Sequence, residues 1–96
     1  MKEILKKLNK AFENKVRLGL MSVLMVNEFK DFTSMKELLD VTDGNLSSHV
    51  KALEKNGYLK IDKMFVDRKP KTTYSITEEG REAFKKHIEA IEKLLG

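Results

Sequence analysis

Apolar residues recur along the first part of this chain at the three- and four-residue spacing of an amphipathic helix. The first twelve residues keep that spacing, which predicts a short N-terminal helix. Asn14 can cap a second helix that runs to about residue 27. This second helix carries two apolar stripes. One can face the domain core, and the other needs cover from the terminal helices or from a second subunit.

A short helix is predicted after a stub of strand at Phe32-Thr33. Ser34 and Glu37 have the spacing of a capping box, in which each side chain binds a free backbone N–H of the first turn. The helix that they open is expected to turn three apolar residues inward: Met35, Leu38 and Leu39. Asp40 and Val41 then form a tight turn, and Asp40 is placed to take the left-handed conformation.

The next helix has two unlike faces. Thr42 can cap it, and Leu46, Val50 and Leu53 form one narrow apolar stripe. Gly57 ends it, since glycine readily adopts the left-handed conformation of a helix C-terminus. The outer face carries only small or cationic residues: Gly44, Ser47, Ser48, Lys51 and Lys55. A helix buried on one side and lined with small polar residues on the other is shaped to lie close against a partner. A short helix, a turn and a longer helix also make the helix-turn-helix arrangement.

After Gly57 the period changes from helical to alternating. Leu59, Ile61 and Phe65 point to one side, which predicts a half-buried strand. Alternation resumes at Thr72, so the two strands should form a hairpin. The turn between them, residues 67–71, holds three cations: Arg68, Lys69 and Lys71.

The last helix is predicted to begin after Thr77, with Glu78 and Glu79 in its first turn, where the helix dipole favours negative charge. Its apolar residues form a seam that a monomer would leave facing water, and the N-terminal helix carries a similar one. Residues 1–12 and 78–95 are therefore the expected homodimer contacts, through Leu5, Leu8, Phe12, Phe84, Ile88, Ile91 and Leu95.

Composition narrows the classes of function. The 96 residues suit one domain, and 19 Lys and Arg against 15 Asp and Glu give a net charge of +4, which permits a nucleic-acid partner. The chain has no cysteine, which excludes disulfides, thiolate catalysis and cysteine metal sites. It has no membrane-length apolar run and no signal peptide, so a cytoplasmic location is expected.

The sequence contains no motif that indicates catalysis or metal binding. There is no glycine-rich phosphate loop, and the serines of the central helix lack the setting of a nucleophile elbow. The two histidines lie on separate predicted helices: His49 is expected to pack on the flank of its helix, and His87 to face solvent. No enzyme activity, metal or cofactor is expected.

Four segments together carry a family resemblance: Arg17-Leu18, FTSMKELL, TDGNLSSHVKALEKNGYL and RKPKTTYSITEEGR. In this order and spacing, over residues 14–95, the chain resembles winged helix-turn-helix transcriptional regulators of the compact MarR/ArsR-like type. The resemblance implies an α+β, mainly helical fold with a three-helix core, a two-stranded wing hairpin and terminal helices. It implies one domain over residues 1–96.

The resemblance further implies a homodimer that binds double-stranded DNA at a roughly palindromic site. The recognition helix would enter the major groove, the wing would contact phosphate or the minor groove, and the start of the preceding helix would meet phosphate. Carried onto this sequence, the DNA-binding residues are Ser34, Lys36, Thr42, Asp43, Gly44, Asn45, Ser47, Ser48, Lys51, Arg68, Lys69 and Lys71.

Some alternatives stay open. Asn45 either reads an adenine by hydrogen bonding to N6 and N7 of that base or stabilises the first helical turn. Asp43 is best explained as a partner of the helix dipole. The paired cysteines of ArsR-type metal sensors are missing, and short terminal helices leave a small-molecule effector undecided. The alternative function is a winged-helix protein-interaction module, although such modules usually place acids or large apolar residues on the recognition face.

Overall fold

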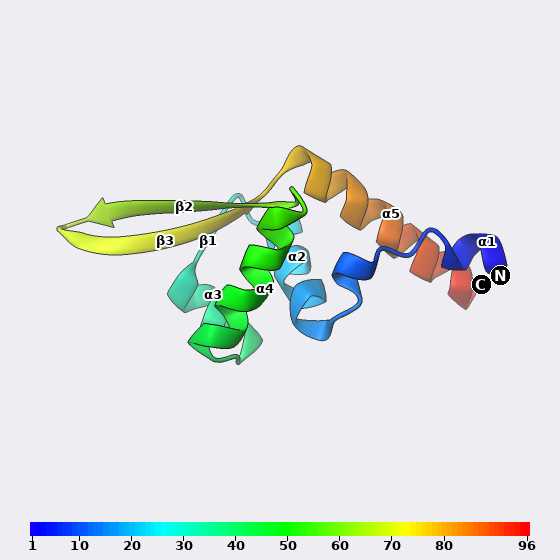
Figure 1. The fold of residues 1–96 in the computed structure, drawn as a ribbon, viewed down its shortest axis with the longest axis horizontal. Coiled ribbons are helices and arrows are strands. Elements are labelled where there is room, and N and C mark those ends of the chain that lie inside the picture. The colour runs from blue at the N-terminus through cyan, green and yellow to red at the C-terminus, as the bar shows by residue number, and fades with distance from the viewer.

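The computed structural model describes residues 1–96 and measures 53 × 25 × 21 Å. Its long axis runs from the tip of a β-hairpin to the two chain ends, which lie together at the other extreme (Figure 1). In chain order the elements are α1 (Lys2–Leu5), the 3-10 helix η1 (Lys10–Phe12), α2 (Lys15–Val26), β1 (Lys30–Asp31), α3 (Phe32–Leu39), α4 (Asp43–Lys55), β2 (Leu59–Val66), β3 (Lys69–Ile76) and α5 (Glu78–Leu95).

The core lies where α2, α3 and α4 meet the base of the hairpin. Leu24 of α2, Met35 of α3 and Leu46 of α4 are fully buried in it. Both apolar stripes of α2 pack against this core, and on that helix only Val26 is a largely exposed apolar residue. The second stripe is therefore covered within the protomer, and α4 packs against the core through its inner face.

The sheet has three antiparallel strands in the order β1-β3-β2, where the sequence predicted a two-stranded hairpin. The added strand β1 covers only Lys30 and Asp31, just before the residues expected to form it. The hairpin turn is also tighter than predicted, because Val66 pairs directly with Lys69 across two residues, Asp67 and Arg68. Both have positive φ, 52° and 65°, as the commonest two-residue hairpin turn requires.

The start of α3 differs from the predicted capping box. Asp31 is the capping residue: its Oδ2 accepts the Ser34 N–H at 3.1 Å, and its Oδ1 accepts the Ser34 hydroxyl at 2.7 Å. Because Asp31 closes the first turn, Phe32 and Ser34 lie inside the helix. The expectation for Leu38 is also wrong, since Met35 and Leu39 occupy the one stripe that faces the core and Leu38 is 58% exposed.

The N-terminal segment is not one helix. It forms α1, a turn and η1, and the side chain of Asn9 caps η1 by accepting the Ala11 N–H. This break lets Phe12 insert beside Tyr58 and Phe84, with ring centroids 5.2 Å from each. Phe12 and Phe84, expected at a subunit interface, are thus 2% and 3% exposed core residues.

The same break buries His87, which was expected to face solvent and is only 3% exposed. Its Nδ1 accepts the Asn9 backbone N–H at 2.9 Å. Burial lowers the pKa of His87, and the negative charge of Glu13 opposes that shift. A neutral histidine therefore fastens the N-terminal segment to α5.

Candidate nucleic-acid interface

The predicted recognition helix is α4, and its sequence sets its orientation. Thr42 caps it, with Oγ1 accepting the Asn45 N–H at 3.1 Å. Leu46, Val50 and Leu53 are fully buried, so the opposite face must point outward. That outward face carries only small or cationic side chains that are exposed: Gly44, Ser48, Lys51 and Lys55.

The turn before α4 is tight. Asp40 takes the predicted left-handed conformation, with φ 52° and ψ 56°. Across this turn the Nζ of Lys36 lies 2.9 Å from Oδ1 of Asp43. Two residues expected to approach DNA are therefore paired with each other, and the charge of Lys36 is partly neutralised.

A groove of about 290 Å³ separates α4 from the hairpin. Ser47 and Lys51 line its α4 side, and Lys63 and Thr72 line its hairpin side. Neither Lys63 nor Thr72 was among the binding residues predicted from the sequence. Strand alternation would have found Lys63, because it lies between Ile61 and Phe65 on the same side of the strand.

The hairpin divides its cations between two sides. Lys71 lines a separate hollow with Met64 and Phe29, on the side away from α4. Arg68 is in the two-residue turn at the tip, and Lys69 follows it. The predicted wing cations are all exposed, but none of them lines the groove beside α4, where Lys63 is the one cation that the hairpin contributes.

The remaining predicted residues fall into two groups. Asn45 is exposed on α4, and its side chain makes no hydrogen bond within the protein. Ser34 is half-buried, and its hydroxyl is already bonded to Asp31, so it is a poor phosphate ligand. His49 is half-buried on the flank of α4, as expected, and faces α2.

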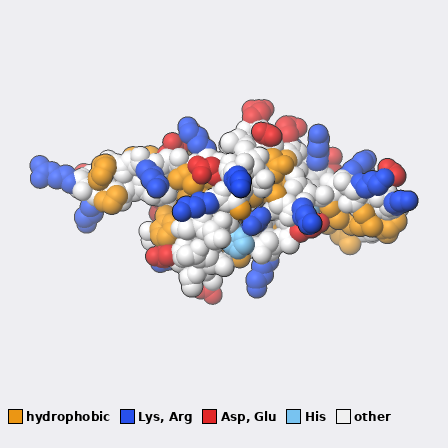
Figure 2. Space-filling model, viewed as in Figure 1, with side chains coloured by type: hydrophobic (Ala, Val, Ile, Leu, Met, Phe, Trp, Pro, Cys, Tyr) orange, Lys and Arg blue, Asp and Glu red, His pale blue; other side chains and the backbone are white.

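Charge is unevenly distributed over the surface. Figure 2 shows Lys and Arg side chains spread over the face on which α4 lies in front and over the hairpin tip, while acidic side chains gather near the start of α5. No group of three or more His, Asp or Glu side chains is arranged to hold a metal ion. No helix is both long enough and apolar enough to cross a membrane.

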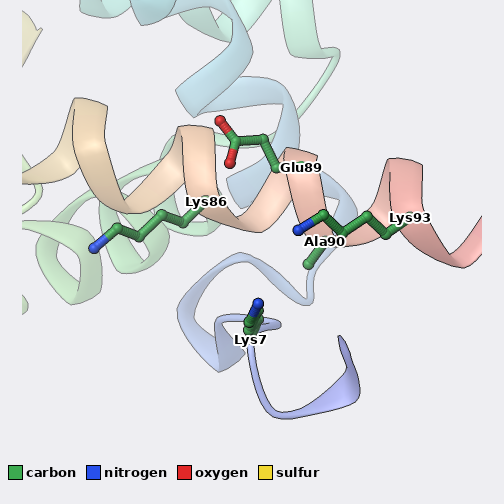
Figure 3. Close-up of a pocket in the computed structure, with 5 residues that line it drawn as sticks. All are labelled: Lys7, Lys86, Glu89, Ala90 and Lys93. Carbon is green, nitrogen blue, oxygen red and sulfur yellow. The ribbon is translucent and has the colours of Figure 1, made fainter. Parts of the chain in front are cut away.

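The N-terminal segment and the end of α5 lie together and are here called the terminal arm. A hollow of about 400 Å³ lies between these two parts of the arm. Figure 3 shows Lys7 rising toward α5 from below, with Glu89 projecting from the other side of that helix. Ala90 is the one apolar residue in a lining that otherwise consists of Lys7, Lys86, Glu89 and Lys93. Small-molecule sites are mostly apolar, so this hollow does not resemble an effector pocket.

Comparison with known proteins agrees with this geometry. The family described as "Winged helix DNA-binding domain" matches residues 16–95. The chain belongs to this family. The winged-helix fold predicted from the sequence is therefore confirmed, with β1 as the addition to its sheet.

Two relatives are similar to this chain over nearly their whole length. An uncharacterized protein of Methanocaldococcus jannaschii, MJ0432, is 39% identical over 85 residues, which cover 88% of this chain and 92% of that protein. A solved transcriptional regulator homologue from Pyrococcus horikoshii OT3 is 37% identical, with a TM-score of 0.87 over 98% of this chain and 91% of its own.

A more distant winged-helix structure is that of AbfR bound to DNA. It is 21% identical and has a TM-score of 0.78 over 95% of this chain and 66% of its own. At this identity the similarity shows the fold. The matched family is one of DNA-binding domains, and the solved Pyrococcus horikoshii protein is described as a transcriptional regulator homologue.

Proposed function

We propose that this winged-helix protein is a sequence-specific double-stranded DNA-binding transcriptional regulator that acts as a homodimer on a roughly palindromic site. The observation that carries the proposal is the outward face of α4. Gly44, Ser48 and Lys51 are exposed there on a helix whose other face is fully buried. The major groove is about 12 Å wide and admits an α-helix, which approaches closely when its outer side chains are small.

The wing extends this surface along the DNA. Lys63 and Lys51 lie on facing sides of the groove between wing and recognition helix, where a phosphate strand would pass. Arg68, Lys69 and Lys71 add charge at and near the tip. Phosphate contacts of this kind supply affinity and orientation but carry no base information. Sequence preference would come from α4, with Asn45, Ser47 and Ser48 closest to the bases.

The terminal arm supports the homodimer. Leu5 is 51% exposed and Leu95 is 84% exposed, and Ile91, one turn before Leu95 on α5, is half-buried. Figure 1 shows α1 and the end of α5 lying together beyond the helical core. An isologous contact between two such arms would cover these apolar residues and relate two recognition helices by a twofold axis.

Selection of bound duplexes from a random DNA pool tests the proposal. We expect an inverted repeat whose half-sites are separated by about 10–10.5 base pairs or a multiple of that spacing. A consensus without inverted symmetry would reject the dimeric arrangement. Failure to enrich any sequence, with weak binding to all duplexes, would reject sequence-specific regulation.

The wing also offers a reason to test the alternative function. Met64, Phe65 and Val66 are 42%, 78% and 44% exposed, an apolar stretch that would suit a protein partner. A gel shift with random duplex at low salt separates the two functions. A DNA-binding wing retards the duplex through its cations, whereas a protein-interaction module leaves the duplex unshifted.

A further inference from the structure

A hydrogen bond between two side chains joins the recognition helix α4 to the start of α2. Nε of Arg17 donates a hydrogen bond to Nδ1 of His49 at 2.9 Å. Both side chains are half-buried, and their residues are 32 positions apart in the chain. The bond requires an unprotonated Nδ1, so His49 is neutral when it holds Arg17.

No carboxylate neutralises the positive charge of Arg17 in this arrangement. Lys36 pairs with the carboxylate of Asp43, but Arg17 makes no ion pair, and its two terminal nitrogens bind no group within the protein. A guanidinium has five N–H donors in a rigid fork, and His49 occupies only the one on Nε. The remaining four suit the oxygens of a phosphate, which arginine often binds through two parallel hydrogen bonds.

The position of His49 on α4 defines where this guanidinium lies. Residues four apart share one side of a helix, so His49 lies on the flank of Asn45. Ser47 and Lys51 occupy the other flank, where they line the groove beside the wing. A helix seated in the major groove has a phosphate strand on each side, and the wing can contact only one of these two strands.

We infer that Arg17 binds a DNA phosphate on the side of the major groove away from the wing, and that His49 is the positioning residue that holds its guanidinium in place. This inference rests on the proposed function and adds a contact outside both the recognition helix and the wing. A half-buried cation without a carboxylate partner is costly for a folded protein by itself. An anionic ligand removes that cost.

Salt titrations of DNA binding test the role of Arg17. Arg17→Gln should lower the log–log salt slope by about 0.9 per protomer, because one phosphate contact and its released counterion are lost. It should weaken binding at fixed salt about tenfold, and equally on every duplex sequence. Lys86→Gln is the matched control, since it removes the same charge from an exposed position on α5 and should leave the slope near that of wild type.

A double-mutant cycle tests the role of His49. His49→Ala should weaken DNA binding in the wild-type background and add no further loss in the Arg17→Gln background. His49→Asn should restore binding, because the amide oxygen of asparagine can accept the Arg17 Nε–H near the position of Nδ1. Thermal melting of each variant identifies any loss caused by unfolding, which would lower the melting temperature and not only the affinity.

The outcomes separate this inference from the proposed function. If wild-type protein fails to bind any duplex at low salt, the proposed function fails and the inference falls with it. If wild type binds but Arg17→Gln keeps the wild-type slope, only the phosphate contact is overturned. If His49→Ala weakens binding equally in both backgrounds, His49 acts independently of Arg17 and its positioning role is overturned.

Discussion

The ammonium of Lys36 and the carboxylate of Asp43 lie 2.9 Å apart across the turn between α3 and α4. Their side chains are 37% and 70% exposed, so the pair adds little to stability. Its consequence is for binding. Asp43, in the first turn of the recognition helix, pairs its negative charge with Lys36 of α3. The positive charge that Lys36 can offer to DNA is therefore reduced.

Asp43→Asn should therefore strengthen DNA binding. The change removes a carboxylate that repels phosphate and frees Lys36, which raises the salt slope by about 0.9 per protomer if Lys36 takes up a phosphate. The folded protein should lose about 0.3–1 kcal/mol, because Asp43 also complements the helix dipole. Salt titration measures the slope, and urea unfolding measures the stability. Adding Lys36→Ala should cancel the gain in slope, and a gain that persists would mean that Lys36 plays no part in it.

Gly44→Ala should change stability and DNA affinity in opposite directions. A Cβ at this position would meet nothing within 4 Å, so alanine should stabilise α4 by about 0.5–1 kcal/mol. The same methyl group would project from the outward face and hold the backbone away from the groove. Thermal melting and binding to a selected site measure the two effects. An unchanged affinity would show that DNA does not approach this turn closely.

Leu5→Glu combined with Leu95→Glu should give a folded monomer that binds a palindromic site weakly. Both side chains are exposed in the protomer, so their replacement should leave its melting temperature nearly unchanged. Phe84→Ala is the contrasting variant, because it should destabilise the core by about 3–5 kcal/mol. Sedimentation of wild type and variants at micromolar concentration measures the assembly. A monomeric wild type would contradict the proposed dimer.

His87 should make the folded protein less stable in acid. Burial lowers its pKa below the ordinary value of 6.5, so the folded state binds a proton less readily than the unfolded chain. Neutral His87 therefore stabilises the fold fully above the pKa of histidine in the unfolded chain. This stabilisation is lost as the pH falls from that value through the lower pKa of the folded state. Urea midpoints from neutral pH to about pH 5 should fall less steeply in His87→Asn than in wild type. His49 also has a lowered pKa, so some pH dependence should remain in that variant.

Lys63 should contribute more to DNA binding than Lys71. Lys63 faces the groove beside α4, whereas Lys71 lies on the far side of the hairpin. Lys63→Ala should lower the salt slope by about 0.9 per protomer, and Lys71→Ala should lower it less. Neither change should alter the sequence preference, because phosphate contacts do not read bases. A larger effect at Lys71 would mean that DNA approaches the wing from its other side.

Much of the fold could be predicted because it depends on residues close together in the sequence. Asn14, Thr42 and Thr77 cap helices as expected, because a capping side chain binds a backbone N–H only two or three residues away. The apolar stripe of α4 could be read in the same way, and with it the small and cationic face opposite. At Asp31 the local interpretation failed, since two capping residues competed and the carboxylate three residues earlier closed the turn.

Other features depend on segments that meet only in the folded chain. The bond from Asn9 to His87 joins residues 78 positions apart, so nothing near His87 in the sequence indicates its burial. Phe12 and Phe84 fit an amphipathic seam equally well as core or as interface, and the break after α1 decides for the core. By itself, then, the sequence determined the helices, the hairpin and the face presented by α4. The tertiary structure decided which cations stand beside that face, because the packing of α2 and of the hairpin against α4 brings Arg17 and Lys63 to its two flanks.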